Sequence, residues 1–259
     1  MTKFSRPQLV FFVLFCLSPR WAGAFQFELS ETEFLSWPMY CQARYSSLTY
    51  LSQRYAFSAN YSQTLTEEAR AQLGAATFER VHHWCAGTTW LNRARLELDP
   101  KKREFELSEA KDESMFTLRG LPPDSTIIPS ILVTLGQICQ EQQNFTCASE
   151  NFEKAIAARP TDALPYSALA LMHRKRKQLD VARDVLKRGD TASGGQSAEI
   201  HYNLGLILLE LGDADGALVY GQKALLEGYP LPGLKKKLMQ IGRWVEPSPN
   251  GIQPPQSPP

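Results

Sequence analysis

Apolar residues recur every three or four positions along most of the chain, and this spacing predicts helices rather than strands. In the first half, the pattern predicts helices from about residue 37 to 54, from residue 66 onward, from about 77 to 98 and from about 101 to 118. We expect residues 25–33 to be extended, Ser36 to cap the first helix and Pro38 to lie in its first turn. Pro122 and Pro123 then interrupt the pattern, so we divide the chain there into an N-terminal helical domain (25–122) and a second region.

Small residues in the second half repeat at a fixed interval. Gly136, Ala170 and Gly205 lie 34 and 35 residues apart. The same two intervals separate Ala148, Ala182 and Ala217, and again Ala155, Gly189 and Ala224, so three sets of small residues form columns when the repeats are aligned. Such columns predict three repeated helix-turn-helix units, at about 129–162, 163–196 and 198–231, because two helices approach closely only where side chains are short. We expect the glycines at 189 and 221 to leave their helices weakly packed.

Polar residues and glycine mark the ends of the predicted repeat helices. The expected N-caps are Asp162, Asp180, Ser197 and Asp213, and Gly228 suits a C-terminal cap. A short amphipathic helix within 232–245 is expected to cover the end of the stack with Leu234, Leu238 and Ile241. The proline-rich segment 246–259 is expected to be disordered and partly polyproline II.

The second half resembles the tetratricopeptide repeat (TPR) family over about residues 129–231. The positions that carry the resemblance in the first repeat are Leu132, Leu135, Gly136, Cys139, Ala148, Phe152, Ala155 and Pro160. In the second they are Tyr166, Leu169, Ala170, His173, Ala182, Leu186 and Gly189, without the closing proline, and in the third His201, Leu204, Gly205, Leu208, Ala217, Gly221 and Ala224. The resemblance implies an all-α, right-handed superhelical stack of antiparallel helix pairs. The two helices before residue 122 form an N-terminal extension that looks like an over-long repeat.

The same resemblance implies a protein-binding groove formed by the first helix of each repeat. Carried over by position, its residues are Val133, Gln137, Gln140, Glu141, Ser167, Leu171, Arg174, Lys175, Tyr202, Leu206, Leu209 and Glu210. The basic run 174–177 is typical of a solvated helix end, and the alternative is a contact with an acidic or C-terminal carboxylate group. The Lys/Asn carboxylate clamp of chaperone-binding relatives is not matched, because Val133 and Gln137 occupy those places.

The first 24 residues have the order of a secretory signal peptide. Lys3 and Arg6 precede an apolar run from Leu9 to Leu17, and Ala22-Gly23-Ala24 offers a small-x-small cleavage site. The alternative is an uncleaved anchor, but the run is far shorter than the ~20 residues that cross a bilayer. We therefore expect a mature chain that starts at Phe25 and is periplasmic or secreted. Its near-neutral charge predicts no nucleic-acid surface, which would need a basic face.

Four cysteines remain after this segment, and an even number in an exported chain permits two disulfides. Sequence alone allows three pairings, and the division of the chain favours Cys41–Cys85 and Cys139–Cys147. The alternative for the second pair is two small buried thiols.

The segment His82-His83-Trp84-Cys85 is the strongest candidate for chemistry. His82 and Cys85 share a helix face, as metal ligands could, but a zinc site usually needs three or four ligands and only Cys41 is an obvious third. The structural alternative is that Cys85 forms a disulfide with Cys41 and that the two histidines pack at a helix interface. Together with residues 91–94, the segment is also similar to a region of exported bacterial repeat proteins.

We found no catalytic constellation, so we expect no enzyme activity, no metal and no cofactor. The predicted function is a periplasmic scaffold that binds a protein or peptide in a cell-envelope assembly. The alternative is an envelope enzyme subunit or a metal- or haem-handling factor that uses residues 82–85.

Overall fold

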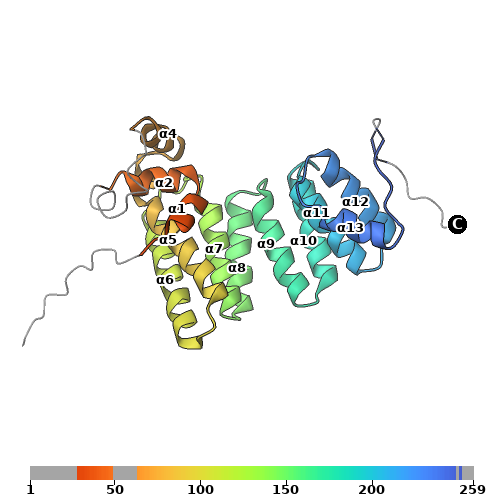
Figure 1. Ribbon diagram of the computed structural model, residues 1–259, viewed down its shortest axis with the longest axis horizontal. Helices are drawn as coiled ribbons and strands as arrows, with labels where there is room; N and C mark the ends of the chain where they lie inside the picture. The colour runs from red at the N-terminus through yellow and green to blue at the C-terminus, as the bar shows by residue number, and fades with distance from the viewer. Residues whose placement is uncertain (1–27, 49–62, 249–250, 253–259) are drawn as a thin grey trace, which may run out of the picture.

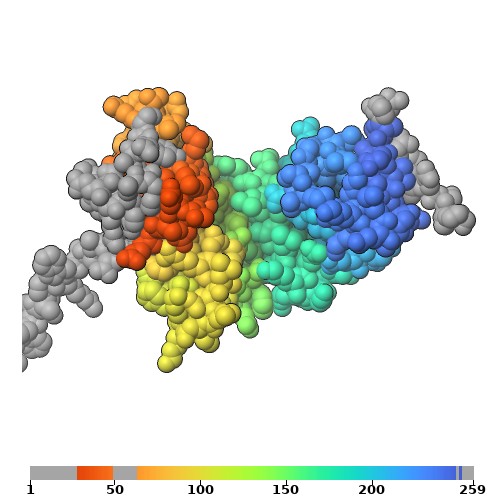
Figure 2. Space-filling model, in the orientation of Figure 1, coloured from red at the N-terminus to blue at the C-terminus, as the bar shows by residue number. Residues whose placement is uncertain are grey.

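The computed structural model describes residues 28–48, 63–248 and 251–252. The predicted signal peptide, its cleavage site and most of the proline-rich tail lie outside these residues. The described part folds as a stack of antiparallel helix pairs, which confirms the all-α repeat architecture (Figure 1). In the space-filling view the stack is elongated, with the N-terminal helices at one end and the last repeat at the other (Figure 2). None of the described helices is both long and apolar enough to span a membrane.

Three short helices pack at the N-terminal end, namely α1 (Glu31–Ser36), α2 (Met39–Ser46) and α4 (Gln63–Leu73). The prediction that residues 25–33 are extended is wrong from residue 31 onward, because Ser30 and Glu33 form a capping box that starts α1. Ser36 ends α1 rather than capping the next helix, and Pro38 is the N-cap of α2. The residue before a proline avoids the helical region, so Trp37 is extended (ψ 152°) and separates the two helices. The predicted helix from 37 to 54 is wrong beyond residue 46, because α2 ends at Ser46 with Ser47 as its C-cap, and residues 49–54 lie outside the described residues.

Helices α5 (Ala75–Leu96) and α6 (Pro100–Arg119) form a long antiparallel pair close to the predicted bounds. Asp99 caps α6 by accepting a hydrogen bond of 2.9 Å from the backbone N–H of Lys102. The two helices touch at Gly87, where an added Cβ would lie 2.7 Å from Ser114 Oγ. This pair is the first full layer of the stack.

Each of the three predicted repeats contains one antiparallel helix pair. The pairs are α7 (Ile128–Glu141) with α8 (Phe145–Ala158), α9 (Ala163–Lys175) with α10 (Leu179–Ala192), and α11 (Ala198–Glu210) with α12 (Ala214–Leu226). The side chains of Asp162, Ser197 and Asp213 cap α9, α11 and α12 as predicted. The prediction for Asp180 is wrong, since it lies in the first turn of α10 and Gln178 is the N-cap.

Packing continues from the N-terminal helices into the first repeat. Ile131, Leu135 and Ile138 of α7 are buried in the same cluster as Phe78 and Val81 of α5. Trp84 Nε1 also donates a hydrogen bond of 3.0 Å to Thr134 Oγ1, which joins α5 to α7. The core therefore crosses Pro122 and Pro123, and the α5–α6 pair packs as a layer of the repeat stack.

The expectation that Gly189 and Gly221 loosen the later repeats is wrong. A Cβ on Gly189 would lie 2.7 Å from Cγ of Tyr166 and 2.9 Å from Cδ1 of Ile200. A Cβ on Gly221 would lie 3.2 Å from Leu234 and 3.3 Å from Trp244. In both places the missing side chain lets a large neighbour pack directly on the helix backbone.

Gly189→Ala is therefore expected to destabilise the protein. Alanine gains about 1 kcal/mol of helix propensity over glycine. Overpacking a filled site costs about 1–3 kcal/mol, and the contacts to Tyr166 and Ile200 fall in the range where a neighbour must move. We expect a net loss of about 1 kcal/mol in urea denaturation, whereas Ser108→Ala on the exposed face of α6 should change stability by less than about 0.5 kcal/mol. A more stable Gly189→Ala variant would contradict this packing.

Helix α13 (Gly233–Gln240) covers the C-terminal end of the stack. Leu234 and Leu238 are buried against the last repeat, as predicted, but Ile241 is 54% exposed because the helix has already ended there. After α13 the chain folds back along α12, where Gln222 Nε2 donates a hydrogen bond of 2.8 Å to the carbonyl of Val245.

Candidate functional site

The first helices of successive layers line one groove of about 450 Å³. Its floor is apolar, formed by Ala168 and Leu171 of α9, and Leu171 is 37% exposed. Polar and charged side chains surround this floor. They come from α5 (Arg95), α7 (Gln137, Gln140), α9 (Arg174, Lys175), the turn after α9 (Lys177) and α11 (Glu210).

Half of the twelve predicted groove residues line this groove. They are Gln137, Gln140, Leu171, Arg174, Lys175 and Glu210. The other six lie elsewhere, and three of them are buried, which corrects their assignment as exposed contact residues. Val133 (3% exposed) packs in the core of the first two repeats, and Leu206 (8%) packs with α13 residues at the end of the stack. Ser167 (1%) accepts a hydrogen bond of 3.3 Å from Asn203 Nδ2 of the next repeat.

The remaining three predicted residues have partners outside the groove. Tyr202 stacks on Tyr229 with ring centroids 4.5 Å apart, beside α13. Leu209 packs against the cluster around Leu234 and Leu238. Glu141 accepts a hydrogen bond of 2.7 Å from Arg103 of α6 and one of 3.4 Å from Arg95, which itself lines the groove.

The groove carries a positive charge. Arg174 Nε donates a hydrogen bond of 3.0 Å to Glu210 Oε1, and this bond lowers the pKa of Glu210 despite its partial burial. Arg95 donates to Gln137 Oε1 at 3.3 Å. Within the part of the chain that the structure describes, no carboxylate lies within 4.0 Å of Lys175 or Lys177. The lining therefore holds four cations and one carboxylate, and two of the cations face solvent without an ion pair.

The basic run 174–177 divides between two surfaces. Three of its residues line the groove, whereas the guanidinium of Arg176 lies over the ring of Phe145, 4.6 Å from its centroid. Sequence reasoning missed Arg95, which belongs to the N-terminal extension. The signal was present, because Arg95 lies in the last turn of α5 as Arg174 lies in the last turn of α9.

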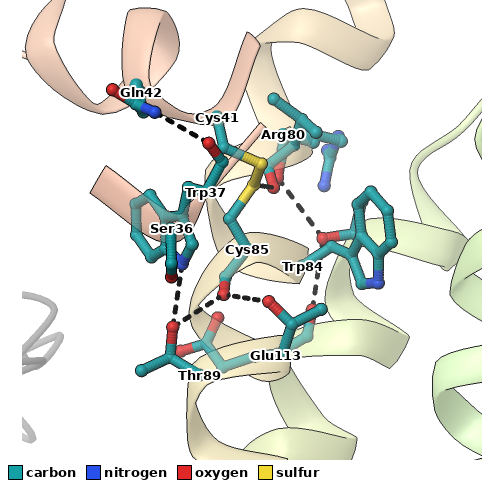
Figure 3. Close-up of a disulfide and its surroundings, with 12 residues drawn as sticks. Ser36, Trp37, Cys41, Gln42, Arg80, Trp84, Cys85, Thr89 and Glu113 are labelled. Atoms are coloured by element: carbon teal, nitrogen blue, oxygen red, sulfur yellow. Dashed lines mark hydrogen bonds between the residues drawn. A yellow bond between two sulfur atoms is a disulfide. The ribbon is translucent and has the colours of Figure 1, made fainter. Parts of the chain in front are cut away.

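The structure joins the cysteines in the favoured pairs. Cys41 and Cys85, with Cα atoms 6.0 Å apart, connect α2 to α5 (Figure 3). Trp37 Nε1 donates a hydrogen bond of 2.8 Å to Thr89 Oγ1 beside this bridge, and Gln42 Nε2 donates to the carbonyl of Trp37 at 2.7 Å (Figure 3). Cys139 and Cys147, with Cα atoms 5.8 Å apart, connect α7 to α8.

Residues 82–85 are used for packing between helices. Cys85 is held in the disulfide, and His83 Nδ1 contacts Glu113 Oε2 of α6 at 2.6 Å. His82 is 7% exposed, and its burial, with smaller effects of His83 and Arg44, lowers its pKa to about 3. Among the described residues, no group of three or more His, Cys, Asp or Glu side chains could hold a metal ion. The arrangement favours the structural interpretation of this segment.

His82 is expected to make the fold acid-sensitive. Its pKa is lower in the folded state than the ordinary value of 6.5, so its contribution to stability is complete above pH 6.5 and is lost as pH falls towards 3. Between pH 7.5 and pH 5 we expect a loss of about 2 kcal/mol from this group. His82→Gln should remove that part of the pH dependence in urea denaturation, and the matched variant His173→Gln should keep it. Equal slopes for the two variants would contradict the assignment.

Comparison with known proteins relates the chain to repeat proteins. A model of the family described as tetratricopeptide repeat matches residues 129–162 and 198–226, which are the first and third repeats. No curated protein matched the chain. Among solved structures, the chain is similar to YrrB, described as "a TPR protein with an unusual peptide-binding site" (15% identity, TM-score 0.45, covering 77% of this chain and 90% of YrrB). It is also similar to a chain of the "APC/C hetero-tetramer Cut9-Hcn1" (15% identity, TM-score 0.44, covering 76% of this chain and 38% of that one).

Proposed function

We propose that this chain, a tetratricopeptide repeat protein, is a scaffold that docks a partner peptide in the groove between α5, α7, α9 and α11. One observation carries the proposal. The repeat register predicts twelve side chains for ligand contact, and six of them line a single groove. This groove has an exposed apolar floor and a cationic rim. The helices that line it, α5, α7, α9 and α11, are held in place by packing against one another, so little of the groove needs to be ordered by the ligand.

The chemistry of the groove favours an acidic peptide with apolar side chains. Lys175 and Lys177 can attract a carboxylate without losing an ion pair, while Leu171 and Ala168 can contact an apolar side chain. Gln137 and Gln140 offer amide donors and acceptors to a peptide backbone. An extended or helical segment of a partner protein with alternating acidic and apolar residues would match these positions.

We further propose that the scaffold acts in the periplasm, in a cell-envelope assembly. The order of basic, apolar and small residues in segment 1–24 supports export. The two cysteine pairs support an oxidising compartment, since disulfides persist there and are rare in the cytosol.

Affinity capture from a periplasmic fraction tests both parts of this proposal. The mature protein should be recovered with Phe25 at its N-terminus, and it should retain a specific partner. The same capture with Lys175→Glu/Lys177→Glu should lose that partner, and Lys154→Glu/Lys187→Glu, on the exposed faces of α8 and α10, should retain it. A partner that survives the groove substitutions would exclude the groove as its docking site, and recovery of an unprocessed chain in the cytosol would exclude the location.

A further inference from the structure

A second hollow lies at the far end of the α5–α6 pair. It measures about 990 Å³ and is formed by the last turns of α5, the first turns of α6 and Glu28, which precedes α1. These helices have 22 and 20 residues, against 13 or 14 in the repeat helices, so the pair reaches beyond its neighbours in the stack (Figure 1). The additional turns contact the end of α7, through Arg95 with Gln137 and Arg103 with Glu141, and they also carry this hollow.

The walls of the hollow are aromatic. The rings of Trp90 and Phe105 meet edge to face with centroids 6.0 Å apart. Phe105 is 55% exposed and Leu96, on the rim, is 83% exposed. Large apolar side chains so accessible to water at the rim of a hollow mark a contact surface for a partner.

Both cations in the lining are already bound to carboxylates. Arg93 donates to both carboxylate oxygens of Glu33, at 2.6 Å and 2.8 Å. Lys102 forms an ion pair with Glu97. Neither cation is therefore available to attract an acidic ligand to this hollow.

The carboxyl group of Glu106 is different. Glu106 lines the hollow and is 4% exposed, and its Oε2 atom is buried without a hydrogen-bond partner among the described residues. Its Oε1 atom lies 4.0 Å from Lys102 Nζ, beyond hydrogen-bond distance. Burial raises the pKa of Glu106, and the nearby carboxylate of Glu97 raises it further, while Lys102 opposes the shift. A buried carboxyl with an unused acceptor is unfavourable until a donor reaches it.

We propose that this hollow binds a lysine or arginine side chain of a partner protein, with its cationic head on Glu106 and its methylene stem against Trp90 and Phe105. A cation in the hollow would pair with the carboxylate of Glu106 and would lie beside Glu97. The guanidinium of Arg93 already lies over the ring of Trp90, 5.0 Å from its centroid, so the aromatic walls serve mainly as apolar contacts for the methylene stem. The groove and this hollow would then select side chains of opposite charge, and one scaffold would hold two different segments. The inference goes beyond the function proposed for the groove and does not depend on it.

A titration followed by NMR tests the proposal on the full mature chain. The probe is acetyl-Leu-Lys-Leu-amide, and the matched control peptide replaces lysine by norleucine, which keeps the stem and removes the charge. The lysine peptide should shift the indole N–H signal of Trp90, identified with Trp90→Phe, and bind at least tenfold more tightly than the norleucine peptide.

Substitutions then identify the group that binds the charge. Glu106→Gln keeps the shape and should weaken the lysine peptide at least tenfold without lowering the melting temperature, because it removes a buried carboxyl. Glu104→Gln, exposed on the same helix, should leave binding unchanged, as should Lys175→Glu/Lys177→Glu in the groove. Equal binding of the two peptides, or a Glu106→Gln variant that binds lysine as tightly as the unmodified chain, would overturn the proposal.

Discussion

Replacing Cys41 and Cys85 together by alanine is expected to lower the free energy of unfolding by about 4 kcal/mol. The bridge spans 44 residues, and cross-linking a loop of that length restricts the unfolded chain by about this amount in the chain-entropy model. Both cysteines are 1% exposed, so the substitution also removes packed sulfur atoms from the core. Urea denaturation of the double variant, compared with the oxidised protein, measures the loss.

The second disulfide provides the matched control. Cys139 and Cys147 are separated by only 8 residues, for which the same model predicts about 2.5 kcal/mol. The two double variants make the same substitutions and differ in loop length and in the burial of Cys147, which is only partly buried. We therefore expect Cys41→Ala/Cys85→Ala to be less stable than Cys139→Ala/Cys147→Ala by about 1.5 kcal/mol. Equal losses, or no loss for the long bridge, would contradict a role for Cys41–Cys85 in holding α2 on α5.

Reversing two charges in the groove is expected to weaken the binding of an acidic peptide about 30-fold. The probe is fluorescein-labelled acetyl-(Glu-Leu)4-amide, and the variant is Lys175→Glu/Lys177→Glu. Each exposed charge pair contributes up to about 1 kcal/mol, and reversal turns each attraction into repulsion, so a combined loss of about 2 kcal/mol corresponds to about 30-fold in affinity. Because these lysines have no ion pair with a described carboxylate, their reversal should leave the fold intact.

Two controls distinguish the groove from the net charge of the molecule. Lys154→Glu/Lys187→Glu changes the net charge equally on helices that do not line the groove, and its affinity should match that of the unmodified chain. The affinity of the unmodified chain should also fall as salt is added, since exposed charges are screened. Equal weakening by both pairs of substitutions would show that binding depends on overall charge alone.

The sequence predicts the repeats well because their signals are local and repeated. Three columns of small residues, with apolar residues between them, predict three helix-turn-helix units, and each of these units contains one helix pair of the structure. The N-terminal end is less predictable. There, a capping box at Ser30 determines where α1 begins and Pro38 separates α1 from α2, and neither signal belongs to a repeating pattern.

The candidate groove is only half predictable because a repeat register identifies faces of a helix and not their burial. Val133, Ser167 and Leu206 lie on the predicted face, but the neighbouring repeat or α13 covers them. Arg95 belongs to the groove although it precedes the family resemblance in the chain. The packing around Gly189 was equally hidden, because the absence of a side chain says nothing about which neighbour fills the space.

Site-specific photo-crosslinking tests the central claim, that a partner protein docks in the groove, most directly. A photoreactive benzoylphenylalanine is placed in cells either at Leu171, on the groove floor, or at Val181, on α10. The two positions are similarly exposed, at 37% and 44%, but only Leu171 lines the groove. We predict a discrete protein adduct from position 171, lost with Lys175→Glu/Lys177→Glu, and none from position 181. Equal adducts from both positions, or an adduct from position 181 alone, would contradict the claim.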